Sequence, residues 1–214
     1  MSVAAKICGL SAEGAVSAAV AGGAAYLGFV FYPPSPRAVT PREAARLCVA
    51  VPAGVARVGL FVDADDAMIE ATLALTSLDV LQFHGSETPE RVGEVRLRFG
   101  LPVMKAVAIA GPKDVCGAAR YEDVADLLLF DAKPPRRPDA LPGGNGLGFD
   151  WGLIADRSWR RPWMLSGGLT AEVRPEAVRI SGATAVDVSS GVESRPGQKD
   201  LGKIRAFLAA ARAL

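Results

Sequence analysis

The sequence predicts an α/β protein built as a single (β/α)8 TIM barrel that spans residues 1–214. Three observations predict this fold. Short apolar runs alternate with longer amphipathic segments along the whole chain. Several of the runs are continuously apolar, as in parallel strands that are buried on both faces. No linker, charge block or low-complexity segment divides the chain, so a single domain is expected.

Eight runs have the length and composition of strands. In chain order they are Val3–Ile7, Tyr26–Phe31, Val58–Val62, Val80–Phe83, Val103–Val107, Leu127–Phe130, Trp163–Leu165 and Ala185–Val188. Eight strand–helix units in 214 residues are close to the minimum length for such a repeat. The alternative is a doubly wound open sheet, which usually needs about five or six strands. The number of strands therefore favours the barrel.

The segments between these runs carry helix signals. Thr40-Pro41-Arg42-Glu43 has the spacing of a capping box with proline at the first helical position. One face of that helix would carry Ala44, Leu47, Cys48 and Val51. Thr88-Pro89-Glu90 and Thr170-Ala171-Glu172 predict two more starts. The segment Asp200–Leu214 predicts a last helix, with an apolar stripe of Leu201, Ile204, Leu208 and Ala211.

Composition and charge exclude several classes of protein. The formal net charge is +1, which gives no electrostatic reason to expect a nucleic acid or a membrane surface as partner. The three cysteines fit neither a zinc pattern nor a disulfide framework, so no metal is expected. No apolar run approaches the ~20 residues that cross a bilayer, and residues 1–6 lack the features of a secretory leader. A cytoplasmic protein is the expectation.

In a barrel the active site lies at the carboxyl ends of the strands. We therefore looked for polar residues and glycines that follow the apolar runs. These are Cys8, Arg37, Gln82 with His84, Asp131, the Gly143–Gly146 loop, Gly167-Gly168, and Asp187 through Gly191. This set predicts a site near the mouth of the barrel.

Two glycine-containing turns after the seventh and eighth runs indicate a phosphate site. They contain Gly167 and Gly168, and then Ser189, Ser190 and Gly191. Glycine lets backbone N–H groups approach phosphate oxygens, serine hydroxyls add donors, and barrels commonly bind phosphate at this position. The alternative is that both are ordinary tight turns.

Cys8 is a candidate for acid–base or nucleophilic chemistry. Alternation along the strand puts Lys6 and Cys8 on the same side, and a nearby ammonium would favour the thiolate. The alternative is an inert, buried cysteine. We interpret Cys48 as a core residue of a helix, and Cys116 as a core or surface residue.

Asp131 directly follows a strongly apolar run, where a carboxylate is costly unless it is hydrogen-bonded, exposed or functional. It is a candidate general acid, with a helix cap as the alternative. The single histidine, His84, is interpreted as a residue of the pocket wall. Arg37 follows a proline-stiffened loop that suits a fixed fork for a carboxylate or phosphate, or else it is a solvated arginine.

Taken in order, these segments resemble the phosphoribosylanthranilate isomerase family of tryptophan biosynthesis. The resemblance covers nearly the whole chain and rests on a set of short motifs. They are Lys6-Ile7-Cys8-Gly9, Gly28–Tyr32 leading to Ser35-Pro36-Arg37, Leu81–Gly85, Asp131, Gly143–Gly146 leading to Phe149-Asp150-Trp151, Ser166–Leu169, Asp187–Glu193 and Pro196–Asp200. Each motif alone is weak, but their order is specific. Asn145 stands where threonine is usual in the family.

The resemblance implies a cofactor-free Amadori rearrangement of N-(5-phospho-β-D-ribosyl)anthranilate. It assigns Asp131 as general acid, Cys8 as general base and Arg37 to the anthranilate carboxylate. It also assigns the phosphate to the two glycine turns. We expect the remaining polar positions to bind other parts of this phosphorylated small molecule: Gln82, His84, Gly144, Asn145 and Asp187.

Two other functions stay open from the sequence. Isomerases of the related histidine-pathway phosphoribosyl substrate use two aspartates, whereas the first-strand position here is Cys8. A non-catalytic phosphate-binding barrel would keep the glycine turns but has no need for Cys8 and Asp131 together. The sequence leaves the oligomeric state open between monomer and homodimer.

Overall fold

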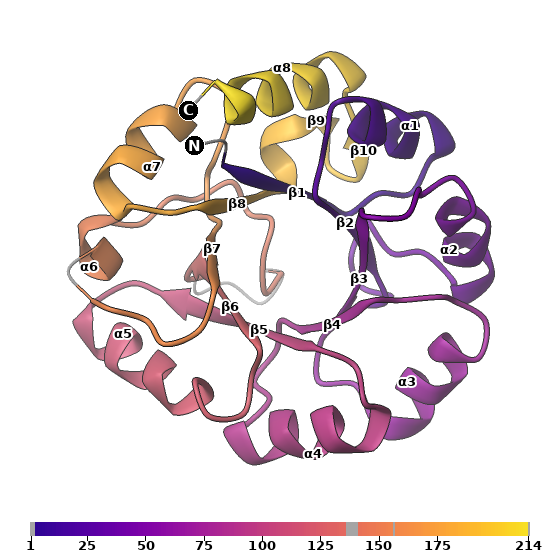
Figure 1. Ribbon diagram of the computed structural model, residues 1–214, viewed down its shortest axis with the longest axis horizontal. Coiled ribbons are helices and arrows are strands. Elements are labelled where there is room, and N and C mark those ends of the chain that lie inside the picture. Colours follow the sequence, from indigo (N-terminus) through magenta and orange to yellow (C-terminus); the bar gives the residue numbers. More distant parts are fainter. Residues whose placement is uncertain (1–2, 136–140, 156, 214) are drawn as a thin grey trace.

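A computed structural model describes residues 3–135, 141–155 and 157–213 and confirms the (β/α)8 barrel. Eight parallel strands close into a ring, and the helices that follow them form an outer ring (Figure 1). Strand β1 pairs with both β2 and β8, which closes the sheet and excludes the open-sheet alternative.

The elements follow the predicted alternation. The barrel strands are β1 Ala4–Cys8, β2 Tyr26–Val30, β3 Ala56–Phe61, β4 Val80–Phe83, β5 Val103–Ile109, β6 Leu127–Ala132, β7 Trp163–Leu165 and β8 Ala185–Val188. The helices are α1 Glu13–Ala21, α2 Pro41–Cys48, α3 Asp66–Leu73, α4 Pro89–Phe99, α5 Pro112–Ala118, α6 Gly152–Ala155, α7 Arg174–Ser181 and α8 Leu201–Arg212. Short 3-10 helices are η1 Ala119–Tyr121 and η2 Ser190–Val192, and β9 Glu193–Arg195 pairs with β10 Gln198–Lys199 as a hairpin after β8.

Several predicted strand ends differ by one or two residues, and two of these corrections bear on the site. Strand β1 extends to Cys8, which pairs with Gly28, and β6 extends to Ala132, so that Asp131 pairs with Ala108. The sequence placed Asp131 after its strand because a carboxylate ends the apolar pattern. The backbone ladder continues through it, because hydrogen bonding between neighbouring strands does not depend on side-chain polarity. The sheet therefore fixes the backbone of both candidate catalytic residues.

The helix starts at Thr40 and Thr88 are confirmed, because each threonine side chain accepts a hydrogen bond from the N–H three residues on. The predicted start at Thr170 is wrong. Thr170 instead caps a turn through a bond from the Val173 N–H, and α7 begins at Arg174. Helix α2 ends before Val51.

The last helix, α8, is confirmed with Asp200 as its cap. Its buried stripe is Ile204, Phe207, Leu208 and Ala211, whereas Leu201 is 37% exposed, so Leu201 does not belong to the stripe. The predicted end at Leu214 lies outside the described residues.

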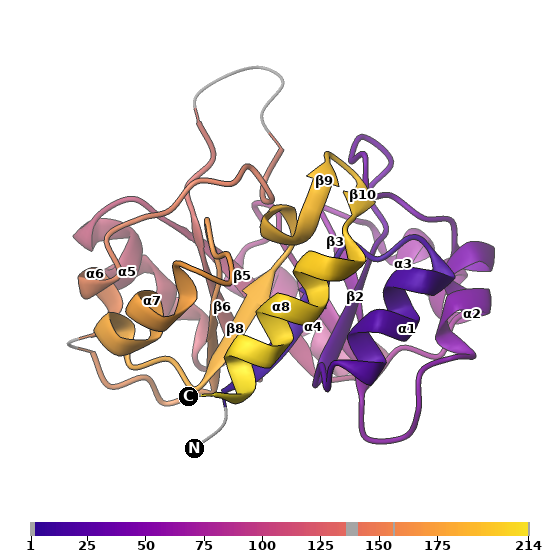
Figure 2. The same cartoon turned by 90° about the horizontal axis from the view of Figure 1, so that it is seen from above.

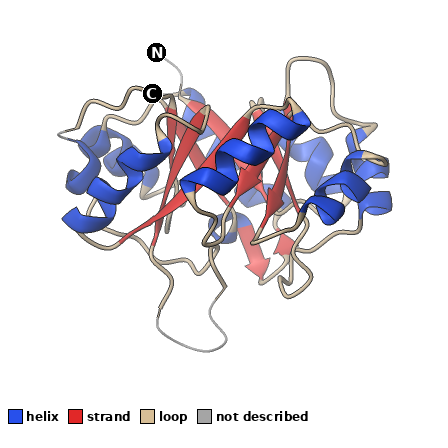
Figure 3. Cartoon of the chain, turned by 90° about the horizontal axis from the view of Figure 1, so that it is seen from below, coloured by secondary structure: helices blue, strands red, loops and turns tan. Residues whose placement is uncertain are grey.

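The lower half of the barrel interior is apolar, formed by Val58, Val80, Met104, Ala106, Leu129 and Met164. A larger apolar core lies between the strands and the helices (Figure 3). Seen from the side, the β9–β10 hairpin and the described parts of the β6–α6 segment rise at one end, whereas β1 begins and α8 ends at the other (Figure 2).

Candidate active site

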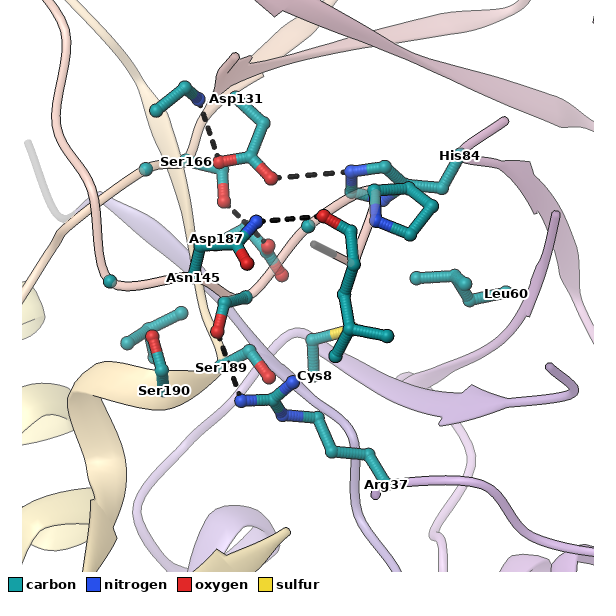
Figure 4. Close-up of a pocket in the computed structure, with 18 of the residues that line it drawn as sticks. Cys8, Arg37, Leu60, His84, Asp131, Asn145, Ser166, Asp187, Ser189 and Ser190 are labelled. Carbon is teal, nitrogen blue, oxygen red and sulfur yellow. Dashed lines mark hydrogen bonds and ion pairs between the residues drawn. The ribbon is translucent and has the colours of Figure 1, made fainter. Parts of the chain in front are cut away.

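A cavity lies at the end of the barrel where the strands terminate. All the predicted site residues except Gln82 line it: Cys8, Arg37, His84, Asp131, Gly144, Asn145, Gly167, Gly168, Asp187, Ser189, Ser190 and Gly191. Cys8, Asp131 and Asp187 lie on β1, β6 and β8, and the others lie in segments that follow strands. Figure 4 shows the labelled side chains converging on one region. The structure therefore brings together residues that are up to 183 positions apart in the chain.

Cys8 lies at the head of a buried polar chain. The Lys6 ammonium donates to Asp187 Oδ1 at 2.9 Å, and the Ser166 hydroxyl donates to Asp187 Oδ2 at 2.9 Å. Burial raises the pKa of the Cys8 thiol, and the neighbouring Lys6 ammonium opposes this. Burial alone would lower the pKa of Lys6, yet Asp187 and Cys8 raise it. Lys6 is thus a permanent cation beside the thiol, as the strand alternation predicted.

Gly28, the β2 partner of Cys8, creates the room for this arrangement. A Cβ at Gly28 would lie 2.9 Å from Cys8 Sγ and 3.2 Å from Lys6 Nζ. Any larger residue would displace the thiol or the ammonium, because packed interiors leave no space to yield. Steric contact with Cys8 and Lys6 therefore explains why residue 28 is glycine.

Asp131 faces the cavity from the opposite part of the ring. Its Oδ1 accepts a hydrogen bond of 2.8 Å from the Ala132 N–H, and its Oδ2 lies 3.2 Å from His84 Nε2. Two glycines flank the carboxylate: a Cβ at Gly143 would lie 2.9 Å from Oδ2, and one at Gly167 would lie 3.2 Å from Oδ1. The carboxyl group is held in a narrow slot that leaves it 8% exposed.

Gln82 does not line the cavity. It is fully buried beneath His84 and contacts it through a hydrogen bond of 3.1 Å between Gln82 Nε2 and His84 Nδ1. The sequence grouped the two residues because both are polar and lie at the end of the fourth apolar run. Alternation puts them on the same side but at different depths, so only His84 reaches the cavity.

Arg37 is 5% exposed, which excludes the solvated alternative. Its Nε and Nη2 donate to the two carboxylate oxygens of Glu193 at 2.8 and 2.9 Å, and Nη2 also donates to the Gly144 carbonyl at 3.1 Å. Nη1 has no hydrogen bond to another described residue. It lies at the position that a Cβ of Gly144 would approach to 2.6 Å. Hydrogen bonds therefore hold the guanidinium through Nε and Nη2, and Nη1 remains available to bind a ligand.

Sequence reasoning missed Glu193 and Lys199, which belong to the β9–β10 hairpin. Lys199 Nζ donates to Glu193 Oε1 at 2.8 Å and to the Ser189 carbonyl at 2.9 Å. Burial alone would raise the pKa of Glu193, but the bonds from Arg37 and Lys199 hold it below its ordinary value. Glu193 and Lys199 lie in the motifs Asp187–Glu193 and Pro196–Asp200. The one sequence signal for a role in the site was an acidic and a basic residue after a serine-containing turn.

The two predicted phosphate turns meet at one side of the cavity. Gly167 and Gly168 have φ of +88° and +65°, and any side chain there would collide with the backbone of Ala132 or Gly148. Within the described residues, neither Gly167 nor Gly168 donates its N–H to a protein acceptor. A side chain at Gly191 would collide with the Leu169 carbonyl. Free amides beside two serine hydroxyls can bind an anion.

Apolar side chains form another part of the wall, among them Val30, Leu60 and Leu169. Among the described residues, no group of three or more His, Cys, Asp or Glu could hold a metal ion. No helix in the described part of the chain is long and apolar enough to cross a membrane. Because apolar side chains line the cavity together with the glycine turns, Asp131 and Cys8, the site can accommodate a flat ring beside an anion, an acid and a base.

Comparisons with known proteins agree on one family. A family model described as "N-(5'phosphoribosyl)anthranilate (PRA) isomerase" matches residues 5–210. The chain is 59% identical to the N-(5'-phosphoribosyl)anthranilate isomerase of Rhodospirillum centenum, over 100% of both chains.

Solved structures give the same result. The crystal structure of phosphoribosyl anthranilate isomerase from Thermotoga maritima superposes with a TM-score of 0.89 and 38% identity, covering 99% of this chain and 100% of that one. A second structure of such an enzyme, in complex with reduced 1-(o-carboxyphenylamino)-1-deoxyribulose 5-phosphate, gives a TM-score of 0.84 and 35% identity, with the same coverage.

Proposed function

Because this chain belongs to the N-(5'-phosphoribosyl)anthranilate isomerase family, we propose that it isomerises N-(5-phospho-β-D-ribosyl)anthranilate in L-tryptophan biosynthesis. The product is 1-(2-carboxyphenylamino)-1-deoxy-D-ribulose 5-phosphate, so the reaction is an aldose–ketose (Amadori) rearrangement. One observation carries the proposal beyond family membership. Cys8 and Asp131 face a single cavity that also contains a clamped arginine and two glycine turns.

Asp131 is the general acid. It protonates the furanose ring oxygen, and the bond between that oxygen and the anomeric carbon breaks to give an open-chain iminium. The slot formed by Gly143 and Gly167 limits the approach of water to the carboxyl group. Low exposure of this kind directs the proton to a bound substrate rather than to solvent.

Cys8 is the general base. It removes the C2′ proton of the iminium and leaves an enolamine, which becomes the ketone when the C2′ hydroxyl loses a proton and C1′ gains one. The thiolate that performs this step is stabilised by the Lys6 ammonium, which the Asp187 carboxylate fixes in place. An acid and a base with different environments can perform opposite proton transfers at one pH.

Arg37 binds the anthranilate carboxylate. Its Nε edge is occupied by Glu193, so Nη1 is the group that faces a ligand. The apolar residues Val30 and Leu60 lie nearby for the aromatic ring. At the other side of the cavity, the amides of Gly167 and Gly168 and the turn from Ser189 to Gly191 bind the 5′-phosphate.

Turnover of phosphoribosylanthranilate, followed as loss of anthranilate fluorescence, tests the proposal. We expect conversion without added metal or cofactor. The histidine-pathway phosphoribosyl substrate, run in parallel, tests the related isomerase activity, for which we expect little or no turnover. If phosphate analogues bind but neither substrate reacts, the chain is a non-catalytic phosphate-binding barrel and the proposal fails.

Cytoplasmic location and a monomeric or homodimeric state remain predictions from the sequence, as does the lack of a nucleic-acid partner. Cell fractionation, light scattering and a gel-shift assay test them in turn.

A further inference from the structure

The single histidine of the chain lies between Asp131 and Gln82. His84 Nε2 is 3.2 Å from Asp131 Oδ2, and His84 Nδ1 is 3.1 Å from Gln82 Nε2 (Figure 4 shows the first contact). The ring is therefore in hydrogen-bond contact on both nitrogens. The backbone of Gly143 covers the pair, since a Cβ there would lie 2.6 Å from His84 Nε2.

These partners determine which nitrogen carries the proton. An amide nitrogen is only a donor, so the Gln82 amide requires His84 Nδ1 to be the acceptor. In a neutral imidazole the proton is then on Nε2, which points at Asp131. An ionised carboxylate only accepts hydrogen bonds, so both contacts of the ring are satisfied by this tautomer.

In the part of the chain that the structure describes, the Gln82 side chain has no hydrogen-bond partner other than His84. Its side chain is fully buried, and its Oε1 has no hydrogen-bond partner among the described residues. A buried acceptor without a donor destabilises the fold, and an apolar side chain would avoid this. Turning the amide over would leave its nitrogen without an acceptor and would place Oε1 at His84 Nδ1, which would then have to carry the proton, so a measurement of the tautomer distinguishes the two orientations. Its interaction with His84 is what the structure gains from an amide at this position.

We propose that Gln82 is a positioning residue that holds His84 as the Nε2–H tautomer, so that His84 donates to the Asp131 carboxylate left after proton transfer. This inference rests on the proposed role of Asp131 as general acid. The hydrogen bond from Nε2–H strengthens when the carboxyl group becomes a carboxylate, because charge-assisted bonds are stronger than neutral ones. His84 therefore stabilises the charge that develops during ring opening, more than it stabilises the resting acid.

The tautomer can be measured directly. Protein labelled with ¹⁵N only in histidine gives ring signals that need no assignment, because His84 is the one histidine. Above neutral pH we expect one protonated nitrogen, Nε2, in the ligand-free protein. A proton on Nδ1 would overturn the proposal, and this measurement needs neither substrate nor a variant.

Gln82→Met keeps the length of the side chain and removes the amide. We expect a mixture of the two tautomers and a decrease in kcat of about tenfold, with KM changed by less than about threefold. Leu81→Met is the matched control: it alters the outward side of the same strand, and both tautomer and kcat should stay as in the wild type. Circular dichroism confirms that both variants fold.

The outcomes separate the two proposals. If Gln82→Met retains a pure Nε2–H tautomer or a wild-type kcat, Gln82 is not the positioning residue. If the tautomer depends on Gln82 but no phosphoribosylanthranilate is converted by the wild type, the proposed function fails, and with it the role of His84 in that reaction.

Discussion

Two of the buried ion pairs, Arg37–Glu193 and Lys105–Glu87, differ in that only the first contributes a residue to the cavity wall. Arg37 pairs with Glu193 beside the site, whereas Lys105 pairs with Glu87 at 2.7 Å behind β4 and β5. In each pair both side chains are almost fully buried. The same combination of charges therefore serves two different purposes.

The two pairs differ in how many hydrogen-bond donors of the cation remain after the carboxylate and the neighbouring carbonyl are bound. Lys105 donates to Glu87 and to the Gly85 carbonyl, and it lies over the Tyr121 ring at 5.6 Å. Glu87 also accepts from the Asp63 N–H, so this cluster only ties loops together. Arg37, which lines the cavity, has more donors than Glu193 and Gly144 accept, since its Nη1 has no hydrogen bond to another described residue. A clamped guanidinium can hold a loop and bind a ligand, whereas a clamped ammonium here can only hold a loop.

The largest effect should come from the two proton-transfer residues on the cavity side. We expect Cys8→Ser and Asp131→Asn each to lower kcat by about 10²–10⁴-fold, because each removes one proton-transfer step. Thermal unfolding should show a folded protein in both cases. Cys116→Ser, at an exposed cysteine, is the control and should keep its activity. Near-native turnover in both site variants would refute the assigned roles.

Removing the loop-holding cation should affect stability rather than chemistry. We expect Lys105→Met to lower the free energy of unfolding by about 3–5 kcal/mol, because it leaves the buried Glu87 without a counter-ion. Denaturant titration measures this. Lys133→Met breaks the exposed pair with Asp114 and should cost no more than about 1 kcal/mol. A similar cost for the two variants would contradict the comparison.

Removing the ligand-facing cation should affect binding. For Arg37→Ala we expect KM to rise by roughly 10–100-fold, the loss of about 1.5–3 kcal/mol for a charged hydrogen bond. Glu193 retains Lys199 as a partner, so the fold should survive. Arg57→Ala breaks the Arg57–Asp79 pair, which lies outside the cavity wall, and should leave KM unchanged. An unchanged KM for Arg37→Ala would refute its carboxylate role.

The smallest effect concerns pH. Burial raises the pKa of Cys8, so in the free protein the thiolate fraction, and with it kcat/KM, should increase with pH beyond the usual range of a thiol. Lys6 opposes this shift, so Lys6→Met should move the rising limb to higher pH by about one unit. Lys133→Met removes an exposed ammonium and serves as the control. A limb that stays in place in Lys6→Met would show that Lys6 does not tune the thiol.

The sequence by itself determined the barrel and most of the cavity wall. Strand alternation and the carboxyl-end rule are local properties of the chain, so they located Cys8, Asp131 and the glycine turns. Their chemical roles came from the resemblance to a family and stand as proposals. The capping residues Thr40 and Thr88 were equally local and were confirmed.

Only the tertiary structure decided which side chains contact each other across the ring. Lys6 pairs with Asp187 over a separation of 181 residues, and Arg37 pairs with Glu193 over 156. Closure of the barrel brings these residues together, and no pattern within a window of a few residues encodes such a contact. The depth of Gln82 beneath His84 has the same origin, because alternation gives the side of a strand but packing gives the layer.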